Sequence, residues 1–129
     1  MLNMSNLERV FSNKKVFITG HTGFKGSWLT FILNEVGAEV MGYALEPSTK
    51  VNHFDMLDLG SKVKHIIGDI SDASHLNDTI YEFQPEYVFH LAAQALVRSS
   101  YEDTAETYST NIMGSVNLLE AVRNTESVR

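Results

Sequence analysis

Three glycines at a spacing of three follow a short apolar run near the beginning of the chain. Gly20, Gly23 and Gly26 lie in the stretch GHTGFKG, directly after a predicted first strand at residues 15–19. A glycine-rich turn between a buried strand and a helix directs backbone N–H groups and the positive end of the helix dipole at one point. Such a turn can hold a diphosphate without any side chain. Its place after the first strand of an alternating α/β sequence makes a dinucleotide the expected ligand.

Two side chains of this stretch have more than one interpretation. Lys25 lies in the predicted first turn of the helix, where a cation opposes the helix dipole at a cost of up to about 1 kcal/mol. A bound anion would convert that cost into attraction, and the alternative is a side chain that extends into solvent. His21 either donates to a phosphate or ribose or fills the turn, and the second interpretation is favoured.

Residues that follow the other predicted strands belong to the same edge of the sheet. Ligands of open parallel sheets bind beyond the carboxyl ends of the strands. Asp69 and Ile70 follow the third strand and offer a carboxylate and a backbone N–H to the edge of an adenine. The alternative for Asp69 is a turn former. The stretch HLAAQ at residues 90–94 follows the fourth strand, and its small residues let a ribose or nicotinamide pass close to the backbone.

The end of the second strand bears on the choice of cofactor. A typical NAD site places an acidic residue there to accept from the ribose hydroxyls. Ala44 occupies that place, and Glu46 follows two positions later. Glu46 either reaches the ribose or is a solvated loop charge. No Lys or Arg follows immediately to accept a 2′-phosphate, which favours NAD over NADP.

Alternating strands and helices must position these residues. The sequence predicts strands at residues 15–19, 39–43, 63–67 and 87–91, and helices at 25–36, from an N-cap at Asp72, and at about 107–123. One or two helical turns are expected near 54–59. This alternation predicts the first half of a doubly wound, Rossmann-like parallel sheet, with about four strands and helices on both faces.

The apolar residues of two helices indicate which faces are buried. Those of the first helix are expected on one inward stripe: Trp28, Leu29, Ile32, Leu33 and Val36. The last helix is apolar on two sides, with Tyr108, Ile112, Val116 and Leu119 on one and Leu118 and Val122 on another.

Composition limits the class of protein. The 129 residues suffice for one domain, expected at 15–129 after a polar extension at 1–14. A formal net charge of −6 without a basic patch argues against nucleic acid as a partner. The absence of cysteine excludes disulfides, thiolate catalysis and a zinc ribbon, and no metal site is predicted. No apolar run approaches the roughly 20 residues of a membrane span. A cytoplasmic protein without membrane contact is therefore expected.

Longer motifs resemble one family. The stretches GHTGFKGSWL, GYALEP, GDISD, FHLAAQALVRSSY and ETYSTNIMGSVNLLEAVR resemble the extended short-chain dehydrogenase/reductases that act on nucleotide sugars. Within that family they are more similar to the CDP-glucose 4,6-dehydratases than to the dTDP-glucose or GDP-mannose dehydratases. The resemblance covers nearly the whole chain from Lys15 onward.

The resemblance implies a set of binding residues. It assigns the NAD diphosphate to Gly20, Gly23, Phe24, Lys25 and Gly26, the adenine to Asp69 and Ile70, and the nicotinamide side to Leu91, Ala92, Ala93, Gln94 and Asn111. Arg98 becomes a candidate contact for the sugar-nucleotide substrate, with a surface ion pair as the alternative. The family's dimer interface corresponds to helices at about 104–123, which implies a homodimer.

The resemblance also implies a reaction that this chain cannot complete alone. In the family, NAD takes hydride from C4 of the sugar, water leaves across C5–C6, and the hydride returns to C6. A tyrosine four residues before a lysine supplies the base, and none of the five tyrosines has that partner. The chain is therefore expected to be an inactive N-terminal part whose fourth strand is an unpaired edge. The alternatives are a dTDP-sugar dehydratase, a 4-epimerase, or a non-catalytic dinucleotide-binding module.

Overall fold

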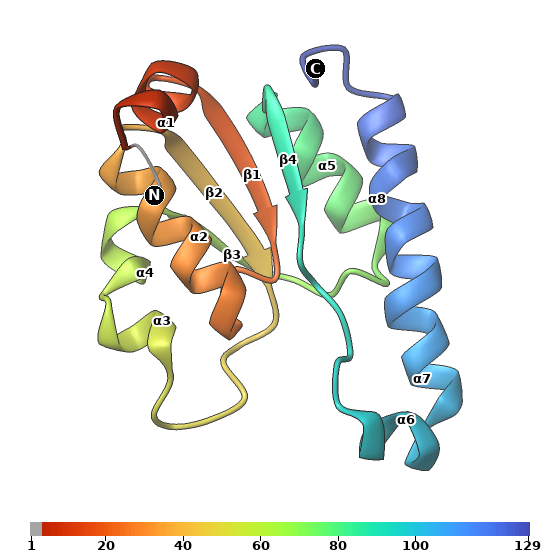
Figure 1. The fold of residues 1–129 in the computed structure, drawn as a ribbon. Coiled ribbons are helices and arrows are strands. Elements are labelled where there is room, and N and C mark those ends of the chain that lie inside the picture. Colours follow the sequence, from red (N-terminus) through yellow and green to blue (C-terminus); the bar gives the residue numbers. More distant parts are fainter. Residues whose placement is uncertain (1–3) are drawn as a thin grey trace.

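Four parallel strands form the centre of the computed structural model, which describes residues 4–129 (Figure 1). The strands are β1 (Lys15–Thr19), β2 (Glu39–Ala44), β3 (Lys64–Ile67) and β4 (Tyr87–His90). Their order in the sheet is β3-β2-β1-β4. All four run in the same direction, so their carboxyl ends meet at one edge. The predicted half of a doubly wound sheet is confirmed.

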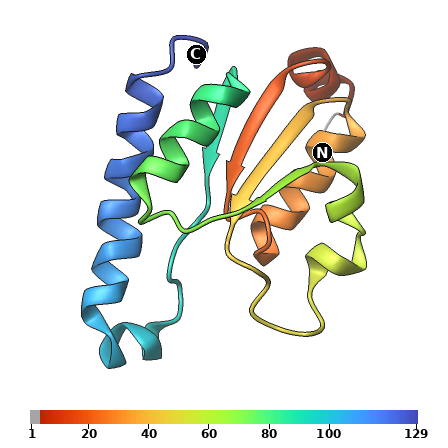
Figure 2. The ribbon, with the colours of Figure 1, turned by 180° about the vertical axis from the view of Figure 1, so that it is seen from behind.

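Helices cover both faces of the sheet. They are α1 (Met4–Phe11), α2 (Phe24–Glu35), α3 (His53–Met56), α4 (Leu59–Lys62), α5 (Ala73–Phe83), α6 (Val97–Glu102), α7 (Thr104–Tyr108), the π-helical segment η1 (Ser109–Met113) and α8 (Gly114–Arg123). The helices α1 to α4 lie on one side (Figure 1). On the other side α5 and α8 lie side by side, and α7, η1 and α8 form one long helix (Figure 2).

The core consists of two layers because neighbouring residues of a strand face opposite sides of the sheet. Val16 and Ile18 of β1 pack under α2 with Leu33. Phe17, between them, faces the other layer with Leu76 of α5. All three β1 residues are fully buried. A central parallel strand that is covered on both faces requires such a continuous apolar sequence.

The inward stripe predicted for α2 is wrong at Trp28, which is 43% exposed. The inward positions near the start of α2 are taken by small residues, Gly26, Ser27 and Thr30. At Gly26 the helix lies directly against the turn after β1, where no Cβ would fit beside Gly20 O. Trp28 turns outward, and its ring lies 4.4 Å from the ring of His53.

The structure adds detail at both ends of the chain. Within the polar extension expected at 1–14, of which residues 1–3 lie outside the described part, the structure has α1, whose Phe11 ring contacts Tyr87 edge-on at 5.2 Å. The last helix begins earlier than expected, at Thr104, and α6 precedes it.

The strand β4 pairs with β1 on one side only, so within residues 4–129 the predicted unpaired edge is confirmed. In the same part of the chain, no helix combines the length and apolar character needed to cross a membrane.

Two adjacent leucines of α8 test the assigned face of this helix. Leu118 is 4% exposed and Leu119 is 67% exposed. We expect Leu118→Ala to lower the free energy of unfolding by about 2–5 kcal/mol, the usual cost of an emptied core position. At a concentration low enough to keep the chain monomeric, the matched control Leu119→Ala should change it by less than about 0.5 kcal/mol. Urea denaturation of both variants measures this, and equal losses would contradict the packing.

Candidate functional site

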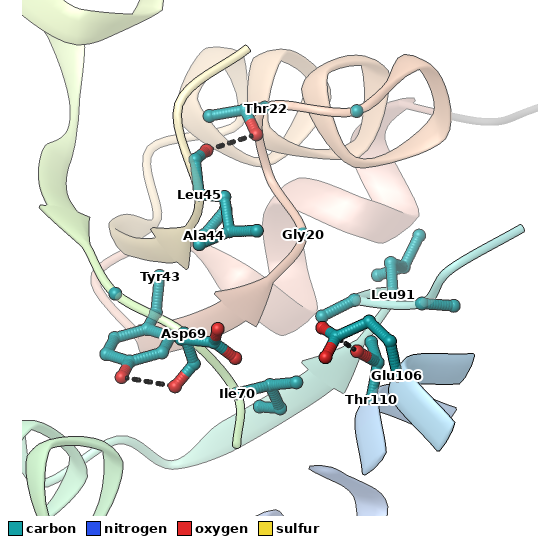
Figure 3. Close-up of a pocket in the computed structure, with 14 residues that line it drawn as sticks. Gly20, Thr22, Tyr43, Ala44, Leu45, Asp69, Ile70, Leu91, Glu106 and Thr110 are labelled. Atoms are coloured by element: carbon teal, nitrogen blue, oxygen red, sulfur yellow. Dashed lines mark hydrogen bonds between the residues drawn. The ribbon is translucent and has the colours of Figure 1, made fainter. Parts of the chain in front are cut away.

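A pocket of about 190 Å³ opens at the carboxyl ends of the strands (Figure 3). Residues that follow every strand contribute to it, as expected for an open parallel sheet. Its lining consists of Gly20, Thr22, Gly23, Tyr43, Ala44, Leu45, Gly68, Asp69, Ile70, Leu91, Ala92, Ala93, Glu106 and Thr110.

The three glycines of the turn have different structural roles. Gly20 adopts a φ of +76°, and a Cβ there would lie 2.6 Å from Ala92 N. Any side chain at Gly20 would therefore push the loop after β4 away. A Cβ on Gly26 would lie 2.0 Å from Gly20 O, so Gly26 permits α2 to begin directly against the turn. At Gly23 a Cβ would make only an ordinary contact of 3.4 Å with Gly20 O.

The N-terminus of α2 lies beside the pocket without a side-chain cap. Gly23 is its N-cap and has no side chain to bond the first N–H groups, and the first turn contains no acidic residue. The N–H groups of Phe24, Lys25 and Gly26 precede the first helical hydrogen bond, which runs from Ser27 N to Gly23 O at 2.9 Å. An uncapped helix N-terminus of this kind attracts an anion.

Hydrogen bonds fasten the turn to the end of β2. Gly20 N donates to Tyr43 O at 2.9 Å. The Thr22 hydroxyl donates to Leu45 O, also at 2.9 Å (Figure 3). The turn therefore keeps a fixed position relative to the wall of the pocket that Ala44 and Leu45 form.

Tyr43 holds the loop after β3. Its hydroxyl donates to Asp69 O at 2.9 Å (Figure 3). Burial raises the pKa of Tyr43 to about 12, and Asp72 and Asp69 add to the shift, so the hydroxyl keeps its proton and remains a donor. Asn117 of α8 donates to Ile70 O at 3.1 Å.

Asp69 forms the turn, one of the two interpretations that the sequence left open for it, and the other, a contact with adenine, stays a prediction. Its Oδ1 accepts from Ser71 N at 2.8 Å and from Ser71 Oγ at 2.7 Å, which forms a turn. The same residue lines the pocket. The N-cap predicted at Asp72 is confirmed, because its Oδ1 accepts from His75 N at 3.1 Å.

Thr19 connects β1 to the loop after β4. Its Oγ1 accepts from Leu91 N and Ala92 N, both at 3.2 Å, and lies 2.6 Å from His90 Nδ1. The hydroxyl proton is therefore available for His90 Nδ1, which leaves Nε2–H to donate to Ser115 Oγ at 3.2 Å. Burial lowers the pKa of His90, which favours the neutral imidazole that this arrangement needs.

The π-helical segment brings Asn111 against Gln94. Asn111 Oδ1 accepts from Gln94 N at 2.8 Å, and Asn111 Nδ2 donates to Gln94 O at 3.0 Å. Segments of π-helix frequently occur at functional sites. Here both side chains support the loop beside the pocket without lining it.

The structure brings together most of the residues that the sequence predicted for the site. The predicted residues that line the pocket are Gly20, Gly23, Asp69, Ile70, Leu91, Ala92 and Ala93. Gly26 is buried behind the turn, and Phe24 and Lys25 are exposed beside it. The Arg98 side chain is 91% exposed and forms an ion pair with Glu102 at 3.0 Å. This ion pair is the alternative that the sequence offered for Arg98. A contact between Arg98 and a substrate stays a prediction.

Sequence reasoning missed one wall of the pocket. Glu106 and Thr110 face it from α7 and η1, joined by a hydrogen bond of 3.3 Å (Figure 3). The polar spacing of these two residues, four apart, was the available signal.

Among residues 4–129, no cluster of three or more acidic or histidine side chains has an arrangement that could hold a metal ion.

A glycine-rich turn at the switch point of a doubly wound sheet places the chain in the class of Rossmann-like α/β proteins. A family model described as GDP-mannose 4,6 dehydratase matches residues 17–129, and the chain belongs to this family. A CDP-glucose 4,6-dehydratase from Salmonella typhimurium is 52% identical over 119 residues, which is 92% of this chain and 33% of the relative. The resemblance predicted from the sequence is confirmed.

More distant relatives share the same part of the chain. A GDP-mannose 4,6-dehydratase from Vibrio cholerae is 37% identical over 117 residues, 85% of this chain and 31% of the relative. The chain thus spans about a third of the length of the curated relatives it matches.

Solved structures support the fold. The Thermotoga maritima UDP-glucose 4-epimerase with UDP-glucose has a TM-score of 0.77 at 34% identity, covering 87% of this chain and 35% of that one. The Brucella ovis UDP-glucose 4-epimerase in complex with NAD has a TM-score of 0.73 at 31% identity, covering 89% and 34%.

His21 lies under the turn and has an unusual pKa. Its ring is fully buried, and Nε2 lies 2.6 Å from His65 Nδ1. Burial first, and His65 second, lower the pKa of His21 to about 4, which the Tyr43 carbonyl opposes only in part. The folded chain therefore holds His21 neutral at pH values where an unfolded chain would protonate it.

This shift predicts a loss of stability in mild acid. In the unfolded state, His21 binds a proton as the pH falls below about 6.5. In the native state it does not bind this proton until the pH falls to about 4. Between pH 7.5 and pH 5 the free energy of unfolding should fall by about 2 kcal/mol on account of this group. Urea denaturation of the parent and of His21→Asn at both pH values measures the difference. An identical pH dependence in the two proteins would contradict the assignment.

Proposed function

We propose that the chain is the NAD-binding part of a nucleotide-sugar 4,6-dehydratase that acts on CDP-glucose. The observation that carries the proposal is the uncapped N-terminus of α2 beside the glycine-rich turn, in a pocket that the ends of all four strands reach. Similarity to the Salmonella typhimurium CDP-glucose 4,6-dehydratase, at 52% identity, supports the choice of substrate.

The residues around the pocket fit a dinucleotide. Gly23 leaves open the space that a Cβ would fill beside the helix N-terminus, where a diphosphate would lie. Asp69 and Ile70 would hold the adenine, and Ala92 and Ala93 would allow a ribose close to the backbone. When bound, NAD supplies a group that accepts and returns hydride. The chain's own part is to bind, orient and shield that group.

The charges around the pocket favour NAD over NADP. Within residues 4–129, no Lys or Arg lines the pocket, whereas the carboxylates of Asp69 and Glu106 do. A 2′-phosphate would therefore find no cation and two acidic neighbours. Ala44 lies at the end of β2, where an acidic residue usually accepts from the ribose of NAD, so here other groups must make that contact.

Catalysis requires more of the protein than this chain. The pocket, at about 190 Å³, is smaller than the roughly 300–1,000 Å³ of typical ligand sites. The sequence has no tyrosine followed four positions later by lysine. We propose that the catalytic groups and most of the sugar site belong to the part of the relatives that this chain does not span.

A homodimer through residues 104–123 stays a prediction, as does the cytoplasmic location. The dimer is supported by a row of exposed apolar side chains along the long helix: Tyr108, Ile112, Val116 and Leu119. Such a row favours association because it removes apolar surface from water.

Gly23→Val tests the diphosphate site. Because a Cβ at Gly23 makes no severe contact, the variant should fold, and its branched side chain should block the diphosphate. Calorimetry should show NAD binding to the parent and none to Gly23→Val. The matched control is Gly60→Val on α4, away from the pocket, which should bind as the parent does. A folded Gly23→Val with unchanged NAD affinity would contradict the assignment.

A turnover assay tests whether the catalytic groups lie outside this chain. The chain incubated with NAD and CDP-glucose should form no 4-keto-6-deoxy product. General acid–base catalysis alone is worth about a hundred- to ten-thousand-fold in rate, and orientation of the sugar is lost as well. The full-length Salmonella typhimurium relative is the positive control. Product above a no-protein control would place the catalytic groups within these 129 residues and end this part of the proposal.

A further inference from the structure

His21 connects the glycine-rich turn to three other elements. Its Nε2 lies 2.6 Å from His65 Nδ1 on β3, and its ring meets Phe54 of α3 edge-on at 5.3 Å. On β2, the ring fits over Gly42, where a Cβ would lie 2.2 Å from ring atoms. The side chain is 0% exposed, so it does not reach the pocket.

The backbone of His21 lies against the beginning of α2. A Cβ added to Gly26 would lie 2.9 Å from His21 Cα. A shift of the His21 backbone therefore also disturbs the helix N-terminus. The ring cannot follow such a shift without leaving its position over Gly42 and breaking its contact with His65.

A simple space-filling role would not require an imidazole. His21 Nδ1 is buried and lies outside normal hydrogen-bond geometry for any group in residues 4–129. An apolar side chain would fill the same space without burying a nitrogen that makes no well-formed hydrogen bond. The imidazole adds a directed hydrogen bond to His65 on β3. This bond fixes the orientation of the turn as well as its distance from the sheet.

We propose that His21 is a positioning residue, whose ring, held by His65 over Gly42, keeps the glycine-rich turn ready to bind a diphosphate. The identity of the ligand rests on the function proposed above, whereas the conformational role does not. A turn that is already ordered loses less conformational entropy when it binds. His21 thus raises affinity without touching the ligand.

Gly42 provides an independent way to displace the ring. His21→Ala removes the ring, and Gly42→Ala forces it out by placing a methyl group in its space. We expect each change to weaken NAD binding by about tenfold, the scale of one lost anchoring interaction. Both changes remove the same contact. The NAD affinity of the double variant should therefore be no lower than that of whichever single variant binds NAD less tightly.

His65 gives a conservative pair of variants, in case Gly42→Ala does not fold. His65→Asn keeps a hydrogen-bonding group near the place of Nδ1, and His65→Ala removes it. We expect NAD affinity close to that of the parent for the first and about a tenfold loss for the second.

Amide exchange in the free chain separates this inference from the identity of the ligand. Gly23 N–H bonds Gly20 O at 3.1 Å and Ser27 N–H bonds Gly23 O at 2.9 Å. Both should exchange faster in His21→Ala and His65→Ala. The control is Gln84 N–H, which bonds Ile80 O at 2.9 Å at the other end of the sheet and should exchange as in the parent.

The outcomes distinguish the two proposals. A parent chain that does not bind NAD ends the proposed function, and the exchange rates then decide the role of His21 alone. Unchanged exchange at Gly23 and Ser27 in folded His21→Ala overturns the positioning role. An equal rise in the exchange rate at Gln84 would also overturn the positioning role. Losses of NAD affinity that add up in the double variant would do the same, because each result indicates a merely structural contribution.

Discussion

The close approach of the turn after β1 to the loop after β4 is the constraint on which the site depends. Gly20 lies so near the backbone of Leu91 and Ala92 that no side chain fits between them, and it adopts a φ of +76°. This contact brings the N-terminus of α2 and the loop after β4 to the same pocket. With any other residue at Gly20 these two walls would have to separate.

Side chains from the neighbouring elements hold this contact in place. Thr19 binds two N–H groups of the loop after β4, and His90 continues the chain of hydrogen bonds to Ser115 of α8. On the opposite wall, Tyr43 fixes the carbonyl of Asp69. The pocket is thus lined mostly by backbone and small side chains; Thr19 and His90 lie behind this lining, and Tyr43 is part of it. Such a lining suits the proposed recognition of a diphosphate by its shape and charge.

The sequence predicted those features that depend on local residue order. The glycine spacing, the apolar strands and the cap at Asp72 all act within a few residues, so their patterns were sufficient. Trp28 was misassigned because α2 packs directly against the turn after β1 at Gly26, and the buried positions that follow are Ser27 and Thr30. The wall formed by Glu106 and Thr110 depends on a π-helical segment and on where α7 lies. Both are results of tertiary packing, and the four-residue spacing of Glu106 and Thr110 indicates only that they share one face of a helix.

An NMR titration of the ¹⁵N-labelled chain with NAD tests directly where a dinucleotide binds. Binding at the glycine-rich turn should cause concentration-dependent shifts of the backbone amides at Gly20–Gly26 together with those of Asp69, Ile70, Ala92 and Ala93. Amides of β3 and α5 near Lys64 and Glu82, which line a separate groove at the opposite end of the sheet, should not move. Shifts confined to that groove, or no shifts at saturating NAD, would show that the glycine-rich turn of this chain does not bind a dinucleotide.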